Sequence, residues 1–188
     1  MITHILKAIC VICTAACAAG AFVSCGDASG SSVRDASSTP ANVTSGDTSA
    51  TDLTAAEFME KALSQAPDSL LDTTTAKGDT SDYGFDKFCK KLYGGTLPDD
   101  LEDGAISYAS SGGNADEVSL LKAADPARQS ELTDKLKERL DMRKRDFEGY
   151  KPEELPKIEK ARIFEAGGFS ILVIADNAED IEKAFNNA

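Results

Sequence analysis

Histidine and tryptophan are almost missing from the sequence, and basic residues are outnumbered by acidic ones. The 188 residues include one histidine, His4, and no tryptophan, and 20 Lys and Arg stand against 32 Asp and Glu, a net charge of −12. Processing that removes His4 would also remove Ser-His-Asp catalysis, Cys-His catalysis and histidine zinc sites. The charge argues against nucleic acid as a partner, because phosphate recognition depends on Lys and Arg clusters. We expect no cofactor and no metal, and we assign no catalytic residue.

The N-terminus has the pattern of a secretory signal peptide. Residues 1–7 carry His4 and Lys7 and no acid, and residues 8–23 are apolar or small throughout. This order is typical of a signal peptide, and the apolar run is shorter than the roughly 20 residues that a transmembrane helix needs. A retained N-terminal anchor, or plain secretion with cleavage nearby, is the alternative.

Cys25 closes a segment, Phe22-Val23-Ser24-Cys25, that resembles the lipobox of bacterial lipoproteins, with Phe22 where that box usually has Leu. The resemblance implies cleavage between Ser24 and Cys25 and a diacylglyceryl group on Cys25. Two acyl chains, at about 0.8 kcal/mol per buried methylene, anchor a protein stably where one chain does not. Cys17 is a weaker rival, because no bulky apolar residue lies three places before it.

The remaining cysteines predict no internal disulfide in the mature chain. Cys10, Cys13 and Cys17 lie in the signal segment, which leaves Cys89 as the one unmodified thiol. Cys89 falls on the apolar face of a predicted short helix, without a histidine or a helix N-terminus near it. We therefore expect a buried thiol rather than a reactive one.

A polar segment separates the signal from the rest of the chain. Residues 26–53 are rich in Ser, Thr, Asp, Gly and Ala and contain few large apolar side chains. Such a composition cannot bury enough surface to offset the entropy of ordering, so we expect a disordered tether. The predicted organisation is a signal peptide (1–24), the lipidated Cys25 with its tether (25–53), and one domain (54–188).

The domain is predicted to be α+β. Two short helices come first: a capping box at Thr54 and Glu57 opens one, and apolar spacing over 85–92 marks the other. A polar loop is expected at 72–82 and a hairpin loop at 111–116. The later elements are strands at 105–110 and 117–124, a helix at 125–148, strands at 161–165 and 169–174, and a helix after Asn177. This β-β-α-β-β-α unit predicts a four-stranded antiparallel sheet with helices on one face.

Six short segments resemble, in order, a family of Gram-positive bacterial lipoproteins known only as domain-of-unknown-function family 4358. They are LYG at 92–94, ADEV at 115–118, LKER at 136–139, FEGY at 147–150, PEELPKI at 152–158 and GFSILVI at 168–174. The resemblance is strongest over 92–188. It implies a surface lipoprotein of a Gram-positive bacterium and supplies no activity, substrate or catalytic residue.

Two arginines occupy unexpected positions on the long predicted helix. At about 100° per residue, Arg139 and Arg143 fall within the apolar stripe that comprises Leu132, Leu136, Leu140 and Phe147. In one interpretation their stems pack on the sheet and the guanidinium groups reach water. If Arg139 is partly buried, it needs an acidic or carbonyl partner. In the other, they form a contact for a carboxylate or phosphate of a ligand or partner.

Three functions stay open from the sequence. The one we favour is a membrane-tethered, non-enzymatic binding or interaction module on the outer face of the cytoplasmic membrane. Its partners would be the membrane, through the diacylglyceryl anchor, and an unidentified envelope protein or glycan. The others are a hydrolase that uses carboxylates or a Ser/Lys pair, and an accessory subunit of an envelope-modifying membrane complex.

Overall fold

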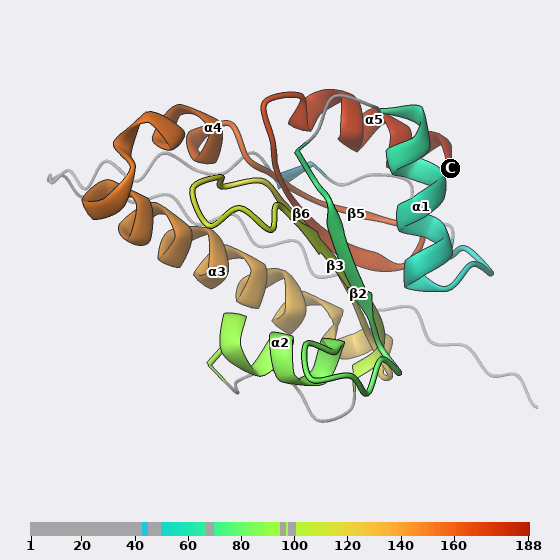
Figure 1. Cartoon of the computed structure of the whole chain (residues 1–188). Coiled ribbons are helices and arrows are strands. Elements are labelled where there is room, and N and C mark those ends of the chain that lie inside the picture. Colours follow the sequence, from blue (N-terminus) through green and yellow to red (C-terminus); the bar gives the residue numbers. More distant parts are fainter. Residues whose placement is uncertain (1–42, 45–49, 67–69, 95–96, 98–100) are drawn as a thin grey trace, which may run out of the picture. The chain divides into compact units, whose positions relative to one another are not determined.

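The computed structural model describes residues 43–44, 50–66, 70–94, 97 and 101–188, which form an α+β domain (Figure 1). The predicted signal peptide and Cys25 lie outside the described residues. The described helices are α1 (Ala55–Gln65), α2 (Phe85–Leu92), α3 (Gln129–Tyr150), α4 (Leu155–Glu159) and α5 (Ala178–Asn187). The described strands are β1 (Val43–Thr44), β2 (Thr73–Ala76), β3 (Leu101–Tyr108), β4 (Glu117–Ala123), β5 (Arg162–Ala166) and β6 (Phe169–Ile174).

The strands form one sheet in the order β1-β5-β6-β4-β3-β2. Neighbours from β5 to β2 are antiparallel, and the two predicted hairpins, β3-β4 and β5-β6, are present. Gly167 and Gly168 join β5 to β6 with φ values of 59° and 84°, which is left-handed backbone that glycine adopts without strain. Strand β4 lies inside the sheet, between β6 and β3.

The predicted four-stranded sheet is wrong in its strand count, because β1 and β2 add to it. Strand β2 lies within the predicted loop 72–82 and pairs with β3 in the register Thr73↔Tyr108 to Ala76↔Ala105. Its three consecutive threonines are β-branched residues that favour extended backbone. Thr74 Oγ1 also donates to Ser107 Oγ at 3.0 Å. A polar edge strand of this kind lacks the apolar alternation by which strands are recognised in a sequence.

The prediction that helices cover one face of the sheet is also wrong. Helices α1 and α5 pack on one face with Val118, Leu120 and Ile171, while α2, α3 and α4 pack on the other with Leu121, Leu172 and Ile174. Figure 1 shows α1 and α5 on one side of the sheet and α2 and α3 on the other. Every residue of β6 is buried, so both faces of the sheet centre require an apolar cover.

The helix boundaries follow local chemistry closely. The predicted capping box is present: Glu57 N donates to Thr54 Oγ1 at 3.3 Å, and Thr54 N donates to the Glu57 carboxylate at 2.9 Å. The Asp125 carboxylate accepts from Ala127 N at 2.9 Å and caps the turn that leads into α3. No described helix is both long and apolar enough to span a membrane.

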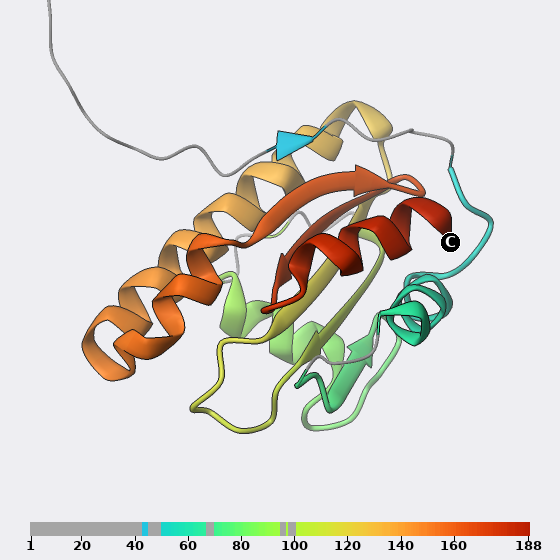
Figure 2. The ribbon, with the colours of Figure 1, turned by 90° about the horizontal axis from the view of Figure 1, so that it is seen from above.

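Part of the predicted tether contacts the domain. Val43 and Thr44 pair in parallel with Ile163 and Phe164 of β5, and Figure 2 shows β1 along this edge of the sheet. Thr51 N then donates to the Gly167 carbonyl at 3.1 Å. The folded domain therefore begins before residue 54, and the predicted tether (25–53) is not disordered throughout.

Deletions from the tether should separate its two parts. Removal of 26–42 should leave the melting temperature unchanged, since these residues precede β1. Removal of 26–53 should lower it by a few degrees, on the order of 1 kcal/mol, because β5 loses its neighbour and Gly167 loses its donor. Thermal unfolding of both deletion variants beside the full chain measures this. Equal melting temperatures in all three proteins would show that β1 contributes nothing to stability.

Candidate functional site

A buried carboxylate begins the central strand β4. The Glu117 side chain is only 2% exposed, and alternation along the strand places it on the face covered by α3, with Ser119 and Leu121. Arg139 of α3 meets it with two hydrogen bonds, Nε to Oε1 at 3.0 Å and Nη2 to Oε2 at 2.6 Å. This bidentate geometry is the strongest that a guanidinium and a carboxylate form.

Arg143 lies one helical turn further along α3 and approaches the same carboxylate. Its Nε is 3.5 Å from Glu117 Oε2, and its Nη2 donates to the Asn114 carbonyl at 3.3 Å. The guanidinium also lies over the Phe147 ring, 4.7 Å from the ring centroid. Two guanidinium groups therefore share one buried carboxylate.

A second ion cluster lies beside the first, where α4 packs against the start of β4. Lys157 Nζ donates to Asp116 Oδ2 at 2.6 Å and to Glu154 Oε2 at 2.9 Å. Glu154 Oε2 also accepts from the Ala115 backbone amide at 3.0 Å. We refer to these six side chains together as the ionic seam: Asp116, Glu117, Arg139, Arg143, Glu154 and Lys157.

Four residues of the seam have shifted pKa values. Burial acts to lower the pKa of Arg139, but Glu117 outweighs this effect, so the pKa is raised. Burial acts to lower the pKa of Lys157 as well, and Asp116 and Glu154 together raise it. For Glu154, burial acts to raise the pKa, and the bonds from Lys157 and the Ala115 amide lower it. Burial lowers the pKa of Arg143 despite Glu117, so Arg143 is the less fully compensated arginine.

Two further ionisable groups lie near Glu117: Cys89 in α2, and Tyr93 at the C-cap of that helix. Burial, with the charges of Asp86 and Glu117, raises the pKa of the Cys89 thiol to about 12. Burial and the same Glu117 charge also raise the pKa of Tyr93. Cys89 is free and buried, which confirms the expected buried thiol. A thiol that stays protonated at neutral pH is not an activated nucleophile.

The structure brings the two predicted arginines together on Glu117. Arg139 is buried and takes an acidic partner, as the sequence argument requires of a buried arginine, so its guanidinium does not reach water. Arg143 stays partly exposed. The predicted cleavage site at Ser24 and Cys25 lies outside the described residues. The sequence did not identify Glu117 or Lys157 as partners, although an acid that opens an apolar strand is itself a signal of a buried ion pair.

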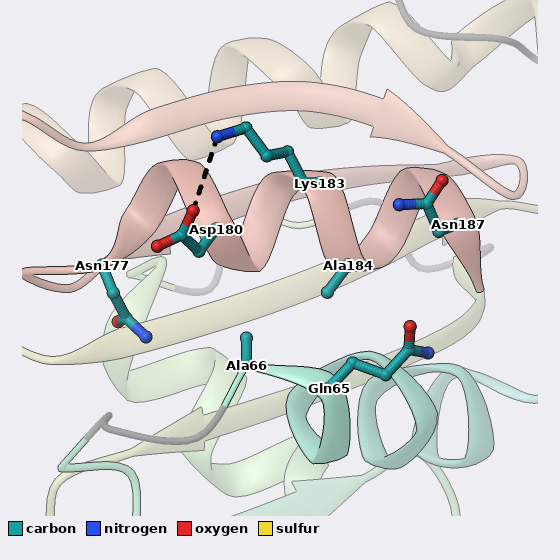
Figure 3. A pocket seen from close by; sticks show the side chains of 7 residues that line it. All are labelled: Gln65, Ala66, Asn177, Asp180, Lys183, Ala184 and Asn187. Atoms are coloured by element: carbon teal, nitrogen blue, oxygen red, sulfur yellow. Dashed lines mark hydrogen bonds and ion pairs between the residues drawn. The ribbon is translucent and has the colours of Figure 1, made fainter.

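A shallow groove lies between the end of α1 and α5. Its volume is about 390 Å³, and its lining comprises Gln65, Ala66, Asn177, Asp180, Lys183, Ala184 and Asn187. Figure 3 shows the Asn177 side chain toward one end and those of Gln65 and Asn187 toward the other. Lys183 pairs with Glu179 at 3.0 Å and with Asp180 at 3.4 Å. Within the described residues, no group of His, Cys, Asp and Glu is arranged to hold a metal ion.

Replacement of Arg139 should show how much stability is lost when Glu117 has no main ion-pair partner. Arg139→Met keeps much of the stem's packing but leaves a carboxylate buried without its main partner. The free energy of unfolding should fall by about 3 kcal/mol or more. The double variant Glu117→Leu/Arg139→Met should recover a large part of that loss, because both charges are then gone. Chemical denaturation measures both effects.

Lys137→Met is the matched control for this substitution. Lys137 lies on the same helix in an exposed pair with Asp134 at 2.9 Å, so its loss should change stability by no more than about 0.5 kcal/mol. Losses of equal size for Arg139→Met and Lys137→Met would contradict a structural role for the buried pair.

Comparison with known protein families matches residues 77–175 to one described as a domain of unknown function, DUF4358. The matched range begins directly after β2 and ends one residue after β6. It contains all six residues of the ionic seam, whereas the seven groove residues lie outside it. Comparisons with curated proteins and with solved structures found no match. Because the match covers more than half of the sequence, the chain belongs to the DUF4358 family.

Proposed function

We propose that the protein is a lipid-anchored lipoprotein on the outer face of the cytoplasmic membrane of a Gram-positive bacterium, and that its domain is a non-enzymatic binding module. The anchor is proposed from the box at 22–25 and the polar residues after it. The first described strand of the sheet, β1, begins at Val43, 18 residues beyond Cys25. A folded unit so close to the proposed anchor would lie within reach of envelope components near the membrane.

We favour binding over catalysis because the carboxylates of the seam are already held by ion pairs. A carboxylate hydrolase needs two carboxyl groups about 5–9.5 Å apart, with substrate or water between them. Asp116 and Glu154 are two seam carboxylates that share one partner. Lys157 lies between them, with bonds of 2.6 Å and 2.9 Å to the two carboxylates. All three side chains are at least 88% buried, and their bonds connect the residue before β4 to the start of α4, which supports a structural role for these carboxylates.

Metabolic labelling with an alkynyl fatty acid tests the anchor. Wild type should incorporate the label and sediment with membranes, and Cys25→Ser should lose the label, because the acylated sulfur is absent. Cys17→Ser and Cys89→Ser are matched controls and should label like wild type. Equal labelling of Cys25→Ser and wild type would refute lipidation at Cys25.

Cross-linked cell envelopes test the binding function separately. The wild-type chain should retain a defined envelope protein or glycan after stringent washing. A chain that releases a new product from isolated envelope material, without retaining a partner, would favour the hydrolase instead.

A further inference from the structure

Two cations converge on one partly exposed turn beside the ionic seam. The turn runs from Ser111 to Asn114, and Asn114 N donates to the Ser111 carbonyl at 3.0 Å. Lys151 Nζ donates to the Gly113 carbonyl at 2.7 Å, and Arg143 Nη2 donates to the Asn114 carbonyl at 3.3 Å. Both cations thus rest on consecutive neutral backbone groups. We refer to Arg143, Lys151 and the turn 111–114 as the cationic corner.

The carboxylates nearest to these cations are already engaged. Both oxygens of Glu117 accept from Arg139, and Arg143 Nε, 3.5 Å from Oε2, makes no hydrogen bond within the described part of the chain. Lys151 Nζ is 3.8 Å from Glu154 Oε1, and the other oxygen of Glu154 is held by Lys157. The charges of Asp146 and Asp116 act to raise the pKa of Arg143. The corner therefore holds two cations with incomplete pairing.

The corner is also open to a ligand. The side chain of Arg143 is 17% exposed and that of Lys151 is 32% exposed. Ser111 and Gly112 are exposed, and a Cβ placed on Gly112 would meet nothing within 4 Å. Tyr150, next to Lys151, is 69% exposed and makes an edge contact with Phe147, the ring beneath Arg143. Arginine and tyrosine are enriched at the centres of binding interfaces.

We propose that the cationic corner binds a single carboxylate or phosphate group of the envelope partner, an inference that rests on the proposed binding function. A guanidinium fork and an ammonium suit such a group, one through paired hydrogen bonds and the other as a point charge. The net charge of −12 disfavours association with polyanions. An isolated anionic group at one cationic position is therefore favoured over a nucleic acid.

NMR titration of the purified full chain tests the corner without its natural partner. Sodium phosphate, sodium acetate and a short-chain phosphatidylglycerol below its micelle concentration are the probes, and sodium chloride at matched ionic strength is the reference. Saturable shifts of the Gly112, Gly113 and Asn114 amides are expected with at least one probe. The three probes distinguish a free phosphate, a carboxylate and a lipid headgroup as the preferred source of the anion.

Two variants and a control decide whether the response is specific. Arg143→Gln and the more exposed Lys151→Gln should each weaken binding about tenfold, while Arg145→Gln, the same charge change at an exposed position of α3, should have no effect. Melting curves show whether each variant is folded. No saturable shift with any probe, or equal weakening by all three variants, would overturn the inference. Because labelling at Cys25 and envelope capture do not depend on this titration, failure here would leave the proposed function standing.

Discussion

The pairing of Glu117 with Arg139 is the constraint on which the arrangement of the second layer depends. A carboxylate in a central strand cannot stay buried and charged without a partner. Glu117 therefore requires a positive charge from the helix that packs over β4. Arg139 can bond both oxygens of Glu117 only in one rotation of α3 about its axis and one position of α3 along the strand. The pair thus fixes the rotation of α3, so that Leu132 and Leu136 enter the same core.

Polar contacts hold α3 to the sheet along its whole length, not only at this pair. Near its start, Gln129 accepts from Ala123 N at 2.9 Å and donates to Ser170 Oγ at 2.8 Å, and the Thr133 and Ser170 hydroxyls are 2.7 Å apart. Toward its end, Arg143 bonds the Asn114 carbonyl, and Lys151, its C-cap, bonds Gly113. The helix is therefore held at both ends and at its middle, while apolar packing fills the spaces between.

Local signals in the sequence predicted the helices and hairpins. They could not predict contacts between residues that lie far apart in the sequence. The capping box at Thr54 and the glycines after β5 act within a few residues, so they can be recognised directly. Strand β2 forms because β3 offers it an edge, which a run of threonines does not reveal. Likewise, the stripe position of Arg139 predicted a buried or binding arginine, but Glu117 lies 22 residues away in the sequence, and only the fold identifies it as the partner.

Exchange of arginine side-chain protons with water, followed by NMR on the full chain, tests the closed ionic seam most directly. The Arg139 Nε proton is expected to exchange about two orders of magnitude more slowly than that of Arg145, because Glu117 holds the first inside the fold while the second is exposed. Equal exchange rates at the two arginines would contradict the account, since they would mean that Arg139 faces solvent and that Glu117 is not what positions α3.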